Sequence, residues 1–196
     1  MKRGLNPATY TLLAIAVLLV LIGGYWYWFV YRPVEGTISP SRELFMSECQ
    51  EAVQDYAAWL QASVDGASAC DASSRFRKPF CLASVTGDSA SCADAAPDTS
   101  TACNAIAAKD KNACADNNYC LAYLGDDAGC AQLGNERLAC AAAVRKDAAY
   151  FSSGESQSDC QDLASRDWAV TNHDAALCGS IANADLKAEC LDTLSR

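Results

Sequence analysis

The spacing of the cysteines constrains this chain more than any other feature. The sequence of 196 residues contains 12 cysteines, and all of them follow one long apolar segment. Between Cys70 and Cys114, successive cysteines are separated by ten residues each. An even number of cysteines beyond an apolar segment is typical of a disulfide framework formed in an oxidising compartment. The pattern therefore predicts a cross-linked domain outside the cytosol.

The apolar segment predicts a membrane anchor. Residues 4–31 contain no charged side chain, and about 20 apolar residues are enough for a helix to cross a bilayer. Lys2 and Arg3 precede the segment, and their positive charge favours a cytoplasmic N-terminus. Bulky aromatic residues follow the apolar core directly, which disfavours a signal-peptide cleavage site. These aromatic residues suit the membrane–water interface and are candidate contacts for a partner: Tyr25, Trp26, Trp28 and Phe29.

The chain is therefore expected to have four parts. They are a cytoplasmic N-terminus at residues 1–9, a transmembrane anchor at 10–31, a linker at 32–41 and an extracytoplasmic cysteine-rich domain at 42–196. The last part would be periplasmic or extracellular, and the lipid bilayer is one partner. The net charge of −9 repels phosphate backbones, so we expect no nucleic-acid partner.

The first residues also support a second interpretation. Arg3, Gly4 and Pro7, followed by a long apolar helix, form a pattern that resembles the start of archaeal type IV pilin-like proteins. In that family a basic residue and a glycine precede the processing site, and a proline lies three residues after it. The resemblance covers about 25 residues. It implies processing after Gly4 and assembly into a filament.

The cysteine-rich part is predicted to be all-α. Its segments are rich in alanine, a strong helix former, and they contain no β-branched runs. Ser41 is a candidate N-cap for the longest helix, at about residues 42–64, which Asp65 and Gly66 end. We expect the rest to form short antiparallel helical hairpins, stacked as irregular repeats. Because alanine buries little area, disulfides would supply much of the stability, at about 2–4 kcal/mol each.

The geometry of a helix limits how these cysteines can pair. Residues eleven apart in one straight helix are separated by about 16 Å, whereas bonded cysteines need Cα atoms within about 7 Å. Each pair must therefore flank a turn, and turn signals such as Gly87-Asp88 lie midway. Pro97-Asp98 is a competing turn, which leaves open a shift of the pairing by one cysteine. The favoured pairs are Cys81–Cys92, Cys103–Cys114, Cys130–Cys140 and Cys178–Cys190. Cys49, Cys70, Cys120 and Cys160 are expected to pair at longer range, with their partners left open.

The sequence offers little that suits catalysis or cofactor binding. It has no C-x2-C motif, and His173 is the only histidine, so zinc-finger, haem-attachment and thiol-redox patterns are missing. His173 lies in a polar run typical of a surface turn. Asp126 and Asp127 are flanked by glycines and indicate a solvated loop, with a weak Ca²⁺ contact as the alternative. Trp168 is expected to pack in the core. We predict no enzyme, no cofactor and no metal.

One basic cluster stands out in this acidic chain. Arg75, Arg77 and Lys78 alternate with Phe76 and Phe80. The first interpretation is a solvated loop whose aromatic side chains point inward. The second is a contact site for an acidic partner or for lipid headgroups.

These observations predict a non-enzymatic, membrane-anchored structural or accessory subunit. It would expose its disulfide-stapled domain outside the membrane as part of a larger membrane or envelope assembly, engaged through the anchor and its aromatic residues. The alternatives are a pilin-like filament subunit that self-assembles and an extracytoplasmic enzyme or redox protein.

Overall fold

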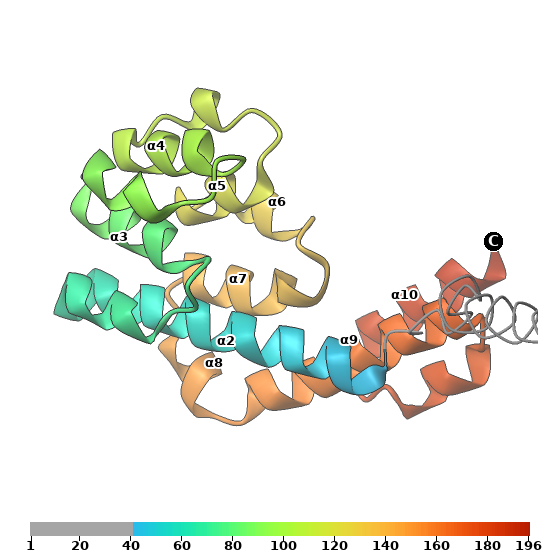
Figure 1. Cartoon of the computed structure of the whole chain (residues 1–196). Helices are drawn as coiled ribbons and strands as arrows, with labels where there is room; N and C mark the ends of the chain where they lie inside the picture. Colours follow the sequence, from blue (N-terminus) through green and yellow to red (C-terminus); the bar gives the residue numbers. More distant parts are fainter. Residues whose placement is uncertain (1–40) are drawn as a thin grey trace, which may run out of the picture. The chain divides into compact units, whose positions relative to one another are not determined.

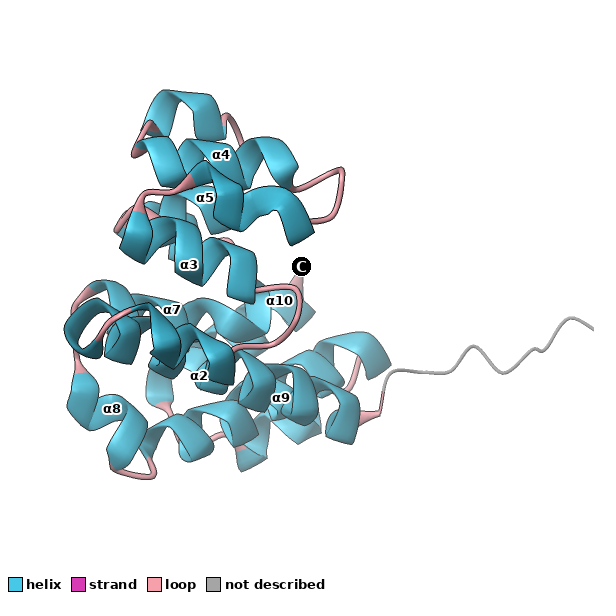
Figure 2. Ribbon diagram, turned by 60° about the vertical axis from the view of Figure 1, so that its left-hand side comes forward, coloured by secondary structure: helices cyan, strands magenta, loops and turns pink. Residues whose placement is uncertain are grey.

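The computed structural model describes residues 41–196, which form helices joined by turns and contain no strand (Figures 1 and 2). The all-helical, disulfide-rich class is therefore confirmed for these residues. Within the same range, no helix combines the length and apolar character that a bilayer span requires. The predicted anchor, the pilin-like processing site and the aromatic contacts at Tyr25, Trp26, Trp28 and Phe29 lie outside the described residues.

Short helices dominate the described part. The α-helices are α2 (Arg42–Asp65), α3 (Lys78–Thr86), α4 (Ser100–Ala108), α5 (Asn118–Tyr123), α6 (Asp127–Cys130), α7 (Arg137–Val144), α8 (Ala148–Ser152), α9 (Glu155–Asn172) and α10 (Ala184–Ser195). The 3-10 helices are η2 (Ala67–Ala72), η3 (Ser89–Asp94), η4 (Lys111–Cys114), η5 (Gly134–Glu136) and η6 (Ala175–Ser180).

Helix α2 connects the rest of the domain. Its N-cap is Ser41, whose hydroxyl accepts a hydrogen bond from the backbone N–H of Leu44, and it ends at Gly66 with φ of 100°. Both ends match the prediction from the sequence, because a hydroxyl cap and a glycine stop are local signals. Helices α3, α7, α8 and α9 all contact α2, and Figure 1 shows α3, α4 and α5 grouped on one side of it.

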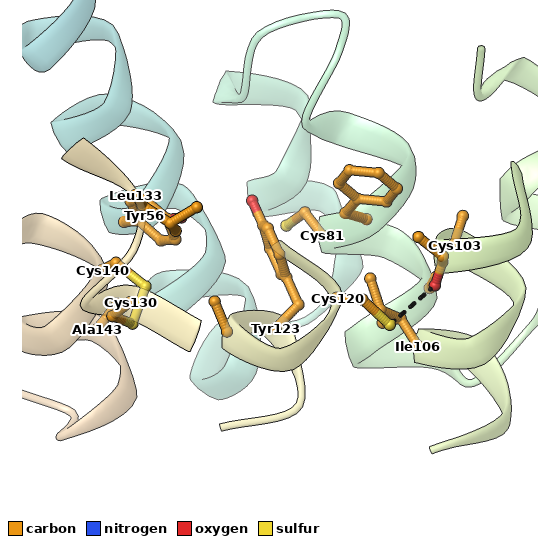
Figure 3. Packing of buried hydrophobic residues seen from close by; sticks show 14 of the residues in the cluster. Tyr56, Cys81, Cys103, Ile106, Cys120, Tyr123, Cys130, Leu133, Cys140 and Ala143 are labelled. Carbon is orange, nitrogen blue, oxygen red and sulfur yellow. Dashed lines mark hydrogen bonds between the residues drawn. A yellow bond between two sulfur atoms is a disulfide. The ribbon is translucent and has the colours of Figure 1, made fainter. Parts of the chain in front are cut away.

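Two hydrophobic clusters hold these helices. The larger one surrounds Tyr56, Ile106 and Tyr123 and includes residues of α2 to α8, whereas the smaller one joins α2 to α9, η6 and α10 around Leu163. Figure 3 shows Tyr123 in the middle of the larger cluster, with Tyr56 and the Cys130–Cys140 disulfide on one side and Ile106 on the other. Most of the remaining members are alanines and half-cystines, so each cross-link also fills core volume.

A recurring turn explains why the helices are short. At five turns, a residue with positive φ follows a helix, and the next residue is an aspartate whose carboxylate accepts a hydrogen bond of 2.9–3.1 Å from the N–H two residues later. This aspartate is the N-cap of the next helix, so the two residues of the turn end one helix and begin another. The turns are Gly87-Asp88, Lys109-Asp110, Gly125-Asp126, Lys146-Asp147 and His173-Asp174.

The disulfides follow this repeat. In four of the turns a cysteine lies four residues after the aspartate, and it bonds to a cysteine in the helix that comes next. No cysteine in residues 41–196 is free. The six bonds are Cys49–Cys160, Cys70–Cys81, Cys92–Cys103, Cys114–Cys120, Cys130–Cys140 and Cys178–Cys190.

Two of the predicted pairs are present, and two are wrong. Cys130–Cys140 and Cys178–Cys190 form, but the predicted Cys81–Cys92 and Cys103–Cys114 do not. Instead Cys81 bonds to Cys70 and Cys103 bonds to Cys92, which is the pairing shifted by one cysteine. Long-range pairing is confirmed for Cys49 and Cys160 but is wrong for Cys70 and Cys120, which form local bonds. The reason is that the turns at Gly87-Asp88 and Lys109-Asp110 lie between one disulfide loop and the next, whereas the prediction placed each turn inside a disulfide loop. The competing turn, at residues 95–99, reverses the chain and brings Cys92 beside Cys103.

The turn at Lys146 and Asp147 breaks the repeat. Phe151 lies four residues after Asp147, at the position where the other copies have a cysteine. Cys160 in α9 therefore has no local partner, and it bonds to Cys49 in α2, 111 residues away. Ion pairs reinforce this region, since Glu189 of α10 accepts a hydrogen bond of 3.0 Å from Arg137 and lies 2.7 Å from Arg166.

Candidate functional site

One hollow of the described surface lies between the turn at residues 73–77 and the turn at residues 95–99. The turn before α3 forms one wall, the turn before α4 forms the other, and Phe80 and Tyr119 contribute apolar surface. Its volume is about 560 Å³, which is within the range of ligand and peptide sites. The residues that line it are Arg75, Phe76, Arg77, Phe80, Asp94, Ala95, Ala96, Asp98, Thr99 and Tyr119. We call this hollow the α3–α4 cleft.

Phe76 is the most unusual residue of the cleft. Its side chain is 77 % exposed, whereas Phe80, four residues later, is only 4 % exposed. Phe76 also lines a second, smaller hollow of about 210 Å³, together with Glu48 and Glu51 of α2. The aromatic ring is therefore shared by two hollows and is available for contact.

The turn that carries Phe76 is held firmly on both sides. Asp55 of α2 is buried, and its carboxylate accepts hydrogen bonds from the backbone N–H of Ser74 and, at 2.8 Å, from the Ser74 hydroxyl. Burial raises the pKa of Asp55, and the hydrogen bonds from Ser74 oppose that increase. On the other side of Phe76, the guanidinium of Arg77 lies 2.6 Å from Glu136, which precedes α7. The turn is thus fixed to α2 and α7.

The Arg77–Glu136 ion pair is surrounded by tyrosines. Tyr119 donates a hydrogen bond of 3.0 Å to Glu136, and its ring lies 3.5 Å from the guanidinium carbon of Arg77. The side chains of Arg77 and Glu136 are 13 % and 19 % exposed, respectively. Burial raises the pKa of Glu136, and Arg77 opposes this effect. Because each of these groups already has an internal partner, the ion pair positions the cleft and is not offered to a ligand.

An aromatic cluster packs against Phe80, which lines the cleft. Tyr123 is buried, and its ring centroid lies 4.8 Å from that of Trp59 and 5.8 Å from that of Phe80. Trp59 donates a hydrogen bond of 3.1 Å to Ser84 of α3. Interlocking rings at these distances resist displacement, so the wall that includes Phe80 is rigid.

The structure divides the predicted basic cluster. Arg77 is paired with Glu136, and Lys78 lies 2.7 Å from Asp71. Arg75 is exposed and has no ion pair within residues 41–196. The interpretation in which both aromatic side chains point inward is wrong for Phe76 and correct for Phe80. The prediction of a contact surface at Arg75, Arg77 and Lys78 stays a prediction.

Carboxylates outnumber cations around Phe76. Asp94 and Asp98 lie on the wall opposite, and Glu48 and Glu51 lie in the second hollow. All four are exposed, and none forms an ion pair with another described residue. The surface is therefore acidic, opposite to the sign that the local sequence indicates.

The sequence analysis missed these carboxylates because they come from other segments. A signal was nevertheless available. Phe76 lies five residues before Cys81, and Asp98 lies five residues before Cys103. Aligning the repeats on the second cysteine of each pair would have placed the two turns at equivalent positions.

The remaining candidates have structural roles. Asp126 caps α6 and pairs with Lys111, Asp127 pairs with Arg145, and exposed His173 ends α9 in the left-handed conformation. Trp168 is partly buried in α9. No group of three or more metal-ligating side chains gathers anywhere in residues 41–196.

No family model, curated protein or solved structure matches this chain. Its function is therefore inferred from the chemistry of its own residues.

Proposed function

We propose that this protein is a non-enzymatic, membrane-anchored subunit of a membrane or envelope assembly. It holds a cross-linked helical domain outside the membrane, where that domain binds a partner. The observation that carries the proposal is the complete pairing of the 12 cysteines into six disulfides.

The disulfides support an oxidising location. Such bonds persist in secreted and extracytoplasmic domains, whereas cytosolic thiols are kept reduced. The core also depends on them, because alanines and half-cystines make up most of its buried residues. A reduced form would bury too little apolar area to offset the entropy of folding. The domain is thus suited to a compartment where its sulfur atoms stay oxidised.

The sequence supports an anchored domain. Residues 4–31 are uncharged and strongly apolar, and Lys2 and Arg3 precede them. An N-terminus in the cytoplasm and a cross-linked domain on the other side of the bilayer satisfy both the charge rule and the redox requirement.

The α3–α4 cleft favours binding over catalysis. Its distinctive groups are exposed carboxylates and an exposed aromatic ring, and aromatic residues are enriched at protein interfaces. Of its other polar groups, Tyr119 and Arg77 are occupied by internal contacts with Glu136. Such a surface recognises a partner by shape and charge.

Two measurements on the native protein test the proposal. Alkylation without reduction, followed by mass spectrometry, is expected to label no cysteine, and alkylation after reduction is expected to label all 12. A protease-cleavable tag after Arg196 is expected to be removed from intact cells whose outer layer has been opened. Alkylation of all cysteines without reduction would refute the location, and so would a tag that is protected until the inner membrane is lysed.

A pilin-like filament subunit is a second candidate, supported by Arg3, Gly4 and Pro7 before the apolar segment. The mass of the mature N-terminus separates the two. A chain that starts at Leu5 and sediments as filaments favours the pilin-like subunit, and an intact Met1 favours the anchored subunit.

A further inference from the structure

We infer that Phe76 and the carboxylates beside it form a docking surface for a basic, apolar segment of a partner protein. The inference deepens the proposed function by giving the chemistry of the partner. The recognition itself depends only on the folded domain and not on its location.

The first argument is the shape of the surface. Phe76 lines both the α3–α4 cleft and the hollow that contains Glu48 and Glu51. An extended segment that crosses this ring would place one apolar side chain against Phe76 and Ala95, with its neighbours over the two hollows. Aromatic side chains, phenylalanine included, are enriched at interfaces, where they anchor one partner on the other.

The second argument is the rigidity of the turn. Ser74, two residues before Phe76, is bonded to Asp55, and Arg77, the residue after it, is bonded to Glu136. Cys70–Cys81 closes the loop that contains all three residues. Because the backbone of Phe76 is fixed in this way, little conformational entropy is lost when a partner binds. The contacts of Ser74 and Arg77 therefore hold the ring of Phe76 in an exposed position.

The third argument is the charge. Asp94 and Asp98 line one of the two hollows that include Phe76, and Glu48 and Glu51 line the other. The only unpaired cation among the residues of the two hollows is Arg75. Lysine or arginine side chains on both sides of the apolar contact would complement these four carboxylates. Anionic lipid surfaces and nucleic acids would be repelled.

The test measures peptide binding to the purified, oxidised full-length chain. The probes are fluorescein-labelled peptides of sequence KLKLKLK, KSKSKSK and ELELELE, and fluorescence anisotropy is recorded at low and high salt. We expect KLKLKLK to bind most tightly, KSKSKSK to bind more weakly because it lacks apolar contacts, and ELELELE not to bind. The affinity for KLKLKLK should fall as salt increases.

Two variants and two controls locate the site. Phe76→Ala is expected to weaken binding of KLKLKLK about tenfold or more, and Asp94→Asn with Asp98→Asn is expected to weaken it several-fold at low salt and less at high salt. Val64→Ala removes an equally exposed apolar side chain, 80 % exposed, at the end of α2. Asp65→Asn with Glu155→Gln removes two exposed carboxylates that line neither hollow. Both controls should bind like the unaltered chain.

Several outcomes would overturn the inference. Equal binding by the Phe76→Ala and Val64→Ala variants would remove Phe76 from the site, and equal binding of KLKLKLK and ELELELE would remove the charge argument. Self-association that Phe76→Ala abolishes would make a second copy of this chain the occupant. Binding to phosphatidylglycerol vesicles through Phe76 would make the occupant a membrane. The substituted side chains are exposed, so each variant is expected to keep its fold, and urea unfolding of each variant checks this.

Failure of this inference and failure of the proposed function can be told apart. A chain that binds KLKLKLK through Phe76 but proves to lie in the cytosol with free thiols would refute only the proposed function. A cross-linked, extracytoplasmic chain that binds none of the peptides would refute only the docking surface.

Discussion

Removing the Cys49–Cys160 bond is expected to destabilise the domain more than removing a local bond. The bond closes a loop of 111 residues, whereas Cys114–Cys120 closes a loop of only 6. Four disulfides nested inside the long loop shorten its effective length to about 77 residues. In the chain-entropy model, a loop of that length corresponds to about 4.5 kcal/mol and a loop of six residues to about 2 kcal/mol.

The comparison uses two double variants of the oxidised full-length chain, Cys49→Ala with Cys160→Ala and Cys114→Ala with Cys120→Ala. All four side chains are buried, so the volume lost from the core is the same in both variants. With a slope of about 2 kcal/mol per molar urea, the midpoint of unfolding should fall by about 2 M in the first variant and about 1 M in the second. Equal midpoints would refute the entropic reasoning, since loop length is the main difference between the two bonds.

Three further predictions concern single side chains. A Cβ at Gly129 would lie 2.7–2.9 Å from atoms of α5, so Gly129→Ala should lower the free energy of unfolding by about 1–3 kcal/mol, whereas Gly179→Ala, with open space around it, should change it little. Lys146 has φ of 62°, so Lys146→Gly should raise the free energy of unfolding by about 1 kcal/mol, whereas Lys187→Gly inside α10 should lower it by a similar amount in urea titrations. The guanidinium hydrogen bond that Glu189 accepts holds its pKa below the usual 4.5. The unfolded chain therefore binds the proton more tightly, and the stability from this group is present above the unfolded pKa and is lost as the pH falls through the folded one. Urea midpoints at pH 7 and pH 3 should differ more for the unaltered chain than for Glu189→Gln, and equal differences would contradict the assignment.

The helices and turns could be predicted because their signals are local. Ser41 and Gly66 bound α2 as expected, and Asp88 and Asp110 act as both turn and cap residues. The pairing of Cys81 could not be predicted in the same way. It lies eleven residues from both Cys70 and Cys92, so spacing alone cannot choose between the two. The choice depends on where α3 packs, which is a tertiary property.

The site was harder to predict than the fold. The partner of Arg77 is Glu136, which is 59 residues away in the sequence, and no local pattern connects them. Phe76 and Phe80 flank the basic residues of one short segment, and the first interpretation was a solvated loop with both rings pointing inward. Helix α3 begins only at Lys78, so Phe76 belongs to the preceding turn and points elsewhere.

The Cys49–Cys160 bond also determines how the molecule responds to a protease. A single backbone cut anywhere between residues 50 and 159 leaves the two fragments attached through sulfur. Tension between the start of α2 and the C-terminus would likewise pass through this bond to α9, and the α3, α4 and α5 helices would bear none of it. A domain connected in this way can be nicked within its repeats and still keep its C-terminal helices tethered to whatever holds its beginning.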